Sequence, residues 1–248
     1  MIVIPMAGLS SRFTKAGYTV PKYMLEAHGK SLFRHAVESF SRYFFDTPFL
    51  FILRDVQGTR DFVVSECEAM GINDARIIAL DCPTRGQAET VYLGLQGADV
   101  GDDESLTIFN IDSLRPGFVH PDWSGESDGY LEVFQGEGEH WSFAEPDPEN
   151  EGRVLRTTEK VRISDLCSNG LYYFSRASDF IEVVNIHSAK SDDELQAGEL
   201  YVAPMYNDLI AKGMDIRFRL VGSDAVLFSG TPDEYVQFKA APLPATEV

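Results

Sequence analysis

The residue types near the start of the chain suit the binding of a phosphate chain. Glycine and serine side chains are small enough to let backbone N–H groups approach phosphate oxygens, and Arg12 and Lys22 supply fixed positive charge for the same oxygens. Taken alone, the small residues are equally compatible with an ordinary connection between a strand and a helix. Together with the two cations, they predict a phosphate-binding loop made of Ala7, Gly8, Ser10 and Ser11.

A carboxylate stands where a buried strand is expected to end. Asp112 follows the apolar run 106–109 after Asn110 and Ile111, and the carboxyl ends of parallel strands are where α/β sheets bind ligands. Magnesium prefers one or two carboxylates together with phosphate oxygens, so we expect Asp112 to hold Mg²⁺ beside the bound phosphates. Without the phosphate loop, an aspartate that ends a strand and caps a turn would be the simpler interpretation.

These motifs resemble the opening of the nucleotidyltransferases that make sugar nucleotides (the sugar-1-phosphate pyrophosphorylases) and of their phosphocholine cytidylyltransferase relatives. That family opens with a strand, then Ala-Gly-x-Gly-[Ser/Thr]-Arg, then Pro-Lys, then Gly-Lys-Pro before a helix. This chain has matching segments at 7–12, 21–22 and 29–31. Ser10 replaces the second glycine of the family and Ser31 replaces its proline. Because a serine keeps the loop small, the first change is compatible with phosphate binding.

The resemblance also implies an acceptor site in the second half of the chain. Glu159-Lys160 matches the Glu-Lys pair of the family, and the segment 168–174 matches its downstream strand through Gly170. By that resemblance Glu159 holds acceptor hydroxyls and Lys160 holds the acceptor phosphate, which suits a carboxylate acceptor and an ammonium donor. Glu199 resembles the start of the family segment that borders this site.

Two further positions are implied to meet the nucleotide base. Gly86 matches a family glycine that lies against the base, and Asp81 stands where the family carries a base-reading glutamine. A carboxylate accepts hydrogen bonds and does not donate them at neutral pH. A buried carboxylate at Asp81 would therefore suit a base with an amino group, and we expect CTP to be a better substrate than UTP or dTTP.

One departure from the family concerns its metal site. The family has an aspartate two residues before a Gly-Thr near its C-terminus, and that aspartate completes the site. The matching segment here is 228–231, so Phe228 stands in place of the carboxylate. Asp224 is the candidate substitute; otherwise Asp112, phosphates and water hold the metal. Because of this departure, the sequence is compatible with an altered acceptor chemistry and also with a loss of activity.

Apolar runs and helical stripes alternate over residues 1–112, with Ser31 as the expected N-cap of the first stripe. This β-α-β order predicts an α/β fold with a doubly wound, mostly parallel Rossmann-like sheet, of the nucleotide-diphospho-sugar transferase type by resemblance. Strands are expected at 2–4, 50–53, 75–80, 106–109, 130–134, 154–158, 171–174, 216–221 and 225–228, and helices around 32–40, 62–70, 88–95, 177–187 and 203–212.

No Ser/Gly-rich linker divides the chain, so we expect a single domain over residues 1–240. Its nucleotide-binding half covers about 1–128, and a smaller acceptor-binding part covers about 129–240. The segment 145–152 is expected to be a polar loop. Residues 241–248 are expected to form a disordered tail.

Composition excludes several classes of partner. The formal net charge of −18 argues against a nucleic acid or an anionic membrane, because phosphate groups would be repelled. No apolar run reaches the roughly 18 residues of a membrane helix, and a cytoplasmic protein is expected. The three cysteines, Cys67, Cys82 and Cys167, lack metal-ligand spacing and are expected to be reduced and buried. The sequence leaves the oligomeric state open, a homo-oligomer included.

The resemblance, together with the phosphate loop and Asp112, implies an Mg²⁺-dependent enzyme that joins an NTP to a phosphorylated small molecule, foremost a sugar 1-phosphate, and releases pyrophosphate. Its product would serve the synthesis of cell-surface polysaccharide precursors. One alternative is a cytidylyltransferase for a non-sugar, phosphocholine-like acceptor. Another is a glycosyltransferase using 110–112 as a metal clamp, although a pyrophosphate leaving group explains Arg12 and Lys22 better. A third is a non-catalytic sugar-nucleotide-binding protein, which Phe228 makes credible.

Overall fold

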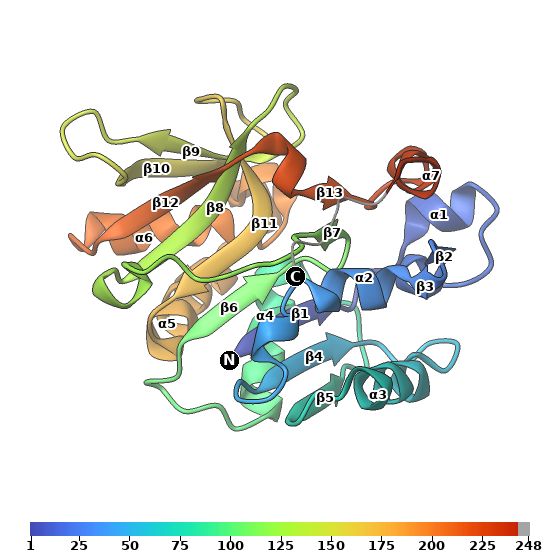
Figure 1. The fold of residues 1–248 in the computed structure, drawn as a ribbon. Helices are drawn as coiled ribbons and strands as arrows, with labels where there is room; N and C mark the ends of the chain where they lie inside the picture. The colour runs from blue at the N-terminus through green and yellow to red at the C-terminus, as the bar shows by residue number, and fades with distance from the viewer. Residues whose placement is uncertain (243–248) are drawn as a thin grey trace. The chain divides into compact units, whose positions relative to one another are not determined.

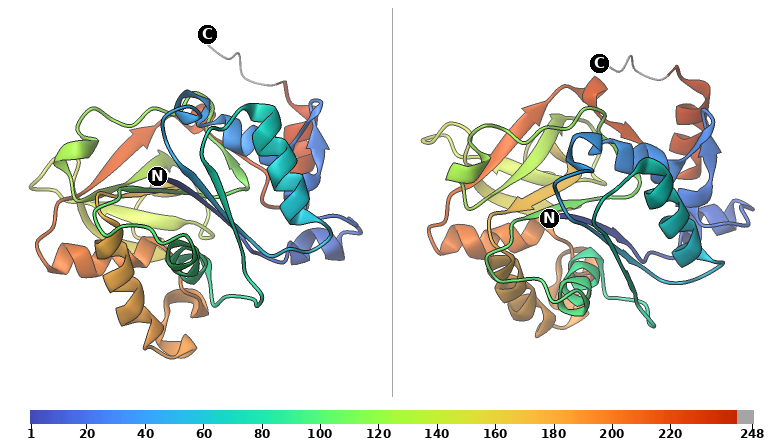
Figure 2. Two further views of the ribbon diagram at one scale, coloured as in Figure 1. Left: turned by 90° about the horizontal axis from the view of Figure 1, so that it is seen from below. Right: turned by 60° about the horizontal axis from the view of Figure 1, so that its bottom comes forward.

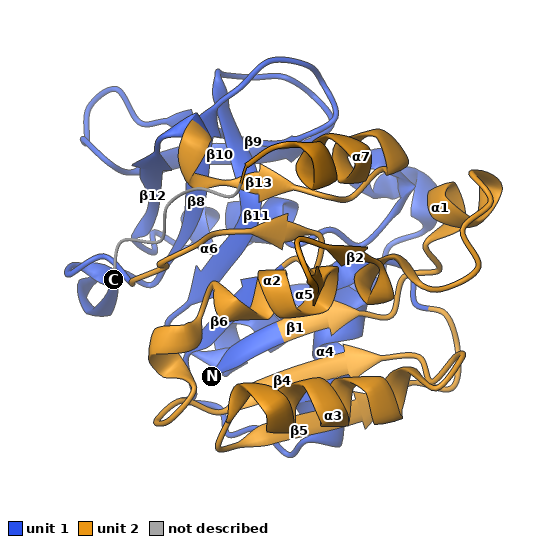
Figure 3. Ribbon diagram, turned by 45° about the vertical axis from the view of Figure 1, so that its right-hand side comes forward, with its two compact units in different colours: residues 1–3, 84–109, 120–223 blue, residues 4–83, 110–119, 224–248 orange. Residues whose placement is uncertain are grey.

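The computed structural model describes residues 1–242, and the chain forms two compact units. Unit 1 contains residues 1–3, 84–109 and 120–223, and unit 2 contains residues 4–83, 110–119 and 224 onwards (Figure 3). Strand β1 (Ile2–Met6) begins in unit 1 and ends in unit 2. The predicted single domain over 1–240 stays a prediction, and the predicted tail lies outside the described residues from position 243.

Unit 1 is built on strands in the order β10-β9-β11-β6-β1, with β8 paired to both β11 and β12 (Figure 1). β6 runs parallel to β1, whereas β11 runs antiparallel to β6, β8 and β9. All nine residues of β11 are buried, as expected for a strand covered on both faces. The elements of unit 1 are α4 (Gln87–Gly97), β6 (Leu106–Phe109), η3 (Ser124–Glu126), β8 (Gly129–Gln135), β9 (Ser142–Pro146), β10 (Val154–Glu159), β11 (Leu166–Phe174), α5 (Ala177–Ser188), η4 (Asp192–Glu194), η5 (Gln196–Gly198), η6 (Ala203–Met205), α6 (Tyr206–Ala211) and β12 (Ile216–Val221).

The helices of unit 1 pack beside one another. α5 contacts both α4 and α6, and the views in Figure 2 show α5 and α6 beneath the strands of this unit. α5 and α6 cover part of β11, because the ring of Phe174 packs against Phe180 of α5 and Tyr206 of α6.

Unit 2 contains the end of β1, followed in the sheet by β4 and β5. β4 pairs in parallel with β5, and all five of its residues are buried. Ser31 caps α2 by accepting a hydrogen bond from the Arg34 backbone N–H (3.1 Å), as predicted. The elements of unit 2 are α1 (Ser11–Lys15), η1 (Lys22–Met24), β2 (Glu26–Ala27), β3 (Lys30–Ser31), α2 (Leu32–Glu38), η2 (Ser41–Tyr43), β4 (Phe49–Leu53), α3 (Thr59–Met70), β5 (Ala75–Ala79), β7 (Ser113–Leu114), β13 (Leu227–Phe228) and α7 (Pro232–Ala240), with η7 (Ser223–Ala225) at its border.

A cluster of buried side chains joins α7 to α1. Tyr235 and Phe238 of α7 pack in one cluster with Phe13 of α1, and the ring centroids of Phe13 and Tyr235 lie 6.3 Å apart. α7 begins with a capping box in which Thr231 and Glu234 exchange side chain-to-backbone hydrogen bonds. The last helix therefore holds the segment that follows the predicted phosphate loop.

The predicted α/β class with a mostly parallel central sheet is confirmed. Several element boundaries differ from those predicted. The strand expected at 171–174 already begins at Leu166, the helix at 203–212 divides into η6 and α6, the strand at 225–228 shortens to β13, and the loop at 145–152 begins inside β9. α1 and α7 were not predicted, because α1 has only five residues and α7 buries only Tyr235 and Phe238, too little for a helical period to stand out.

Two remaining expectations concern the thiols and the membrane. Cys67 and Cys167 are buried as expected, but Cys82 is exposed, so the prediction of buried thiols is wrong at that position. Cys82 lies three residues beyond β5, which is the last strand in the sheet order and has no fully buried residue. No helix in residues 1–242 is long and apolar enough to cross a membrane.

Candidate active site

The predicted phosphate loop connects β1 to α1 in unit 2. Ser10 has φ 50° and ψ 33°, a left-handed conformation at the position where the resembling family carries a glycine. Its hydroxyl accepts a hydrogen bond from the Lys22 backbone N–H (3.3 Å), which ties the loop to the turn at Lys22. A Cβ added to Gly8 would meet no atom within 4 Å. Ala7 is buried, whereas Ser11 and Arg12 are exposed at the start of α1.

Lys22 and Asp112 form an ion pair within unit 2. The Lys22 Nζ lies 2.5 Å from the Asp112 Oδ2, and both side chains are partly buried. Burial of the Asp112 carboxyl favours its protonated form. The charge and hydrogen bond of Lys22, together with the charge of Arg12, outweigh this effect and lower the pKa of Asp112. The structure thus brings together a predicted phosphate-binding cation and the predicted metal ligand.

The C-terminal segment that matches the family's metal site lies against Asp112, as the resemblance implies. β13 pairs with β7 so that Phe228 is opposite Ser113, and the Ser229 backbone N–H donates to the Asp112 carbonyl (2.9 Å). A Cβ added to Gly230 would lie 2.7 Å from Asp112 Oδ2 and 3.5 Å from Glu234 Oε2. The glycine therefore lets two carboxylates border one small space.

This donor set fits a magnesium ion better than it fits a metal held by protein alone. No group of three or more His, Cys, Asp or Glu side chains in the described residues is arranged to hold a metal. Two carboxylates completed by phosphate oxygens and water are what Mg²⁺ accepts. The nearest atoms to the space at Gly230 belong to Asp112 and Glu234. Asp224, the candidate substitute, is exposed in η7, and its role stays a prediction.

Asp81 does not have the environment that was expected of a base-reading carboxylate. It lies two residues beyond β5 and is exposed, so the prediction that it is buried is wrong. Leu80 still donates its backbone N–H to the Leu53 carbonyl (2.8 Å), and after this bond the chain leaves the sheet edge. The preference for CTP stays a prediction, without the burial on which it was argued.

Glu159 is held in a buried hydrogen-bond network in unit 1. It ends β10 with 5% of its surface exposed. The Ser142 hydroxyl donates to its Oε2 and lies 3.2 Å from the Tyr172 hydroxyl. Its backbone N–H donates to Gln196 Oε1 (2.8 Å). Burial raises the pKa of Glu159, and the bond from Ser142 and the charge of Lys160 offset this only in part.

Lys160 follows with φ 55° and points to an aromatic partner. Its Nζ donates to the Tyr201 hydroxyl (2.5 Å) and lies 4.6 Å from the centroid of that ring. Burial opposes its charge, but Tyr201, Glu159 and Glu199 outweigh it and raise the pKa of Lys160. Glu199 is exposed and lines, with Tyr201, a cavity of about 310 Å³. The structure therefore brings Glu159, Lys160 and Glu199 together.

At two of the predicted site positions, the fold itself explains why the residue is a glycine. Gly170 is buried in β11 with φ 90°, where the register against β8 shifts between Ser168 and Tyr172, so it forms a β-bulge. A Cβ at Gly86 would lie 2.6 Å from the Leu200 carbonyl oxygen. The absence of a side chain at Gly86 thus permits close approach of the Leu200 backbone. The predicted ligand contacts of both glycines stay predictions.

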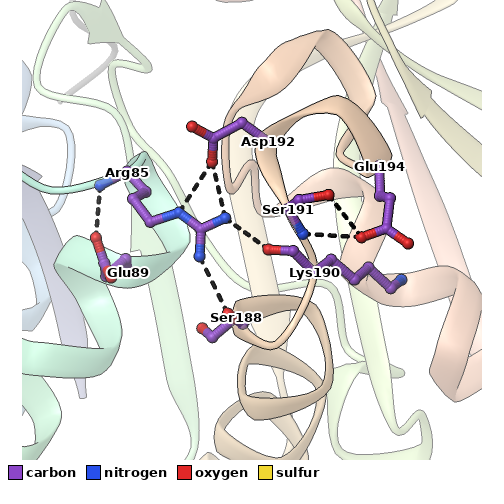
Figure 4. Close-up of polar contacts among 7 residues, drawn as sticks. All are labelled: Arg85, Glu89, Ser188, Lys190, Ser191, Asp192 and Glu194. Atoms are coloured by element: carbon purple, nitrogen blue, oxygen red, sulfur yellow. Dashed lines mark hydrogen bonds and ion pairs between the residues drawn. The ribbon is translucent and has the colours of Figure 1, made fainter.

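Arg85, which precedes Gly86, forms a hydrogen-bond network with segments close to the contact between Gly86 and Leu200 (Figure 4). The Arg85 guanidinium donates to Asp192 (2.8 and 3.1 Å) and to the carbonyls of Ser188 (3.1 Å) and Lys190 (2.8 Å). Its backbone N–H donates to Glu89 (2.5 Å), and its carbonyl accepts from the Leu200 N–H (2.9 Å). Arg85 therefore fixes the loop after α5 and the segment that carries Glu199 and Tyr201.

Sequence reasoning missed several residues of these sites. The sequence marks Glu234 only as a helix-capping residue, because it follows Thr231 by three positions. No sequence pattern marks Gln196. Arg54 is half-buried directly after β4 and lines a cavity beside Gly8 and Ser10. The rule that selected Asp112, a charged residue at the end of a buried strand, would also have selected Arg54.

Comparison with solved structures identifies close and distant relatives. The crystal structure of the nucleoside-diphosphate-sugar pyrophosphorylase from Vibrio cholerae RC9 is 54% identical and covers 97% of this chain and 100% of its own, with a TM-score of 0.93. The inositol-1-phosphate CTP transferase from T. maritima is 15% identical over 98% of this chain and 97% of its own (TM-score 0.69). A UDP-glucose pyrophosphorylase complexed with UDP-glucose is 15% identical over 96% of each chain (TM-score 0.71). These two distant likenesses show the fold alone.

Neither a family model nor a curated protein matches the chain. The fold and the Vibrio relative nonetheless define the class of protein: a nucleotidyltransferase, an enzyme that transfers nucleotidyl groups. At 54% identity over almost its whole length, the chain belongs to the nucleoside-diphosphate-sugar pyrophosphorylase family.

Proposed function

We propose that this enzyme transfers the nucleotidyl group of an NTP to a sugar 1-phosphate and releases pyrophosphate. The ion pair between Lys22 and Asp112 is the observation that carries the proposal. In this pair the predicted phosphate-binding cation, Lys22, contacts the predicted metal ligand, Asp112. The predicted phosphate loop has open space at Gly8. The Vibrio nucleoside-diphosphate-sugar pyrophosphorylase, 54% identical to this chain, supports a sugar nucleotide as the product.

The reaction needs charge neutralisation more than acid–base chemistry. An oxygen of the acceptor phosphate attacks the α-phosphorus in line, and a new O–P bond forms as the bond from the α-phosphorus to the bridging oxygen breaks. Pyrophosphate leaves with that electron pair. Because a phosphate monoester is already an anionic nucleophile, catalysis consists of positioning and charge stabilisation. Arg12 and Lys22 neutralise charge on the transferring and leaving phosphates.

Mg²⁺ is part of the proposal, held by Asp112 and Glu234 at the space beside Gly230. A bound Mg²⁺ would supply two positive charges to the phosphate oxygens. Lys22 keeps Asp112 ionised, since its ammonium lowers the pKa of that carboxyl. The proposal thus replaces the family's aspartate at Phe228 with a glutamate from the first turn of α7.

For the acceptor, we assign the phosphate to Lys160 and the sugar hydroxyls to Glu159 and Glu199. Glu159 and Lys160 are oriented by Ser142 and Tyr201 before any ligand binds, which lowers the entropy cost of binding. A supply of precursors for cell-surface polysaccharides and a cytoplasmic location complete the proposal.

Pyrophosphate release tests this function. The purified protein is mixed with Mg²⁺, each of CTP, UTP, GTP, ATP and dTTP, and a panel of sugar 1-phosphates plus phosphocholine. We expect release only when nucleotide, metal and a sugar 1-phosphate are all present. Release with phosphocholine alone would favour the cytidylyltransferase alternative. Nucleotide binding without release for any acceptor would contradict the proposal.

A further inference from the structure

Arg54 has, on its guanidinium, a buried donor atom from which no described residue accepts a hydrogen bond. It follows β4 directly in unit 2, and its Nε is buried without a hydrogen-bond partner among residues 1–242. Within that range only Arg34 Nε shares this condition, and it lies 3.2 Å from a carboxylate oxygen of Glu66. Arg54 has no ion pair with any described residue. A buried donor without an acceptor is unfavourable, more so on a charged group, so its acceptor is expected to come from a ligand.

The side chain lines a small cavity beside the phosphate loop. The cavity has a volume of about 50 Å³ and is bordered by Gly8 and Ser10 and by the apolar residues Met6, Pro21 and Val56. Pockets that enclose a whole small-molecule ligand have roughly 300–1,000 Å³, so this space admits a small group and not a triphosphate. A guanidinium carries only donors, and the group that enters must therefore be an acceptor.

We propose that Arg54 contacts the nucleotide and donates to a carbonyl oxygen of its base, so that the enzyme disfavours adenine. Cytosine, uracil, thymine and guanine each carry a carbonyl oxygen, whereas adenine has none. The apolar border of the cavity suits the edge of a base better than a phosphate group. This inference rests on the proposed nucleotide site, because the same loop would bind the phosphates.

Binding without catalysis tests the role of Arg54. Dissociation constants are measured by calorimetry for CTP, UTP, GTP, dTTP, ATP and inorganic tripolyphosphate, which has no base. Wild type, Arg54→Met and Arg54→Lys are compared. Arg60→Met is the matched control, since Arg60 is exposed on α3 and does not line the cavity.

We expect wild type to bind ATP more weakly than its preferred carbonyl-bearing triphosphate. Arg54→Met should weaken that triphosphate about tenfold or more and change tripolyphosphate by less than twofold. Arg54→Lys should recover part of the loss, and Arg60→Met should match wild type. If Arg54→Met does not fold, as judged by its melting curve, Arg54→Lys and Arg54→Gln take its place with the same expected direction.

Three results would overturn the inference. An equal loss for tripolyphosphate would make Arg54 a phosphate contact, and unchanged affinity for every triphosphate would leave it without a ligand role. ATP bound as tightly as the carbonyl-bearing nucleotides would remove the base preference. A wild-type protein that binds no triphosphate would contradict the proposed function itself, which separates that failure from the failure of Arg54.

Discussion

The two groups of candidate residues differ in how their charges are held before a ligand arrives. In unit 2, Arg12 is exposed, Arg54 Nε lacks a partner in the described part of the chain, and Lys22 pairs with one carboxylate. In unit 1, Glu159 is buried and accepts a hydrogen bond from Ser142, and Lys160 donates to Tyr201.

The difference suits two kinds of ligand. A triphosphate carries several negative charges, and cations with few internal partners can turn toward it. A sugar phosphate offers many hydroxyls that must be told apart, and groups already fixed by Ser142, Tyr201 and Gln196 discriminate by position. We therefore expect changes in unit 2 to act on turnover and changes in unit 1 to act on acceptor binding and on stability.

Asp112→Asn should have the largest effect. The amide keeps the shape of the side chain but removes its charge, so Mg²⁺-dependent pyrophosphate release should fall to background. A Mg²⁺ titration of the initial rate, with a melting curve to verify folding, measures it. Asp61→Asn, at an exposed position of α3, is the control and should retain activity. If the Asp112 variant kept its activity with Mg²⁺, the metal would have to be held elsewhere.

Arg12→Ala and Lys22→Ala should have the next largest effect on turnover. The two variants should differ in thermal stability. Each loses a charge-assisted contact of about 2–4 kcal/mol in the transition state, so kcat/KM should fall roughly 30- to 1,000-fold. Arg12 is exposed, and its loss should leave Tm unchanged. Loss of Lys22 leaves Asp112 without its ion-pair partner and should lower Tm.

Turnover and Tm of both variants are compared with Arg60→Ala, an exposed control on α3. Unchanged turnover in both would refute the assignment of the phosphate loop.

Gly86→Ala should act on the acceptor side. Its Cβ would lie 2.6–2.9 Å from the Leu200 backbone, and overpacking of this kind costs about 1–3 kcal/mol. We expect a lower Tm and a several-fold higher KM for the acceptor, with the KM for the NTP changed less. Gly101→Ala, with nothing within 4 Å of its added Cβ, is the control. A change confined to the NTP would instead support the predicted contact of Gly86 with the base.

Glu159→Gln should have the smallest effect on stability, and the size of this effect depends on pH. The folded state raises the pKa of Glu159 above its ordinary value of 4.5. The ionised group therefore disfavours folding above the raised pKa, and this effect vanishes below pH 4.5, where both states hold the proton. We expect the variant to melt about 1–3 °C higher than wild type at pH 7 and to match it near pH 4.

Melting curves across this range measure the difference, with acceptor KM as a second readout. The KM should rise for the variant, because an amide replaces the carboxylate assigned to the hydroxyls. A Tm difference that did not change with pH would contradict the titration of Glu159.

Local pattern accounts for the parts of the fold and site that could be predicted. β4 was predictable because a central strand needs a continuous apolar run, and all its residues are buried. Lys22 was singled out by its motif after Pro21, and Asp112 by the rule that strand ends bind ligands. The same rule would have selected Arg54 had it been applied to every strand.

The remaining features depend on partners that are remote in the sequence. Gly86 needs no side chain because Leu200 approaches it, and nothing near Gly86 in the sequence reveals that partner. Glu234 borders Asp112 only because β13 pairs with β7 and places the start of α7 there. Asp81 was expected to be buried from its match to a family position, but burial depends on the path of the whole loop.

The packing of α7 on α1 also has a consequence for the order of synthesis. Phe13 leaves the ribosome long before Tyr235 and Phe238, so it lacks these two neighbours while most of the chain is being made. We expect the loop between β1 and α1 to reach its final position only after residues 232–240 have been translated. A nascent chain arrested before that point would have its strands but would bind nucleotide poorly, which delays activity until translation of α7 is finished.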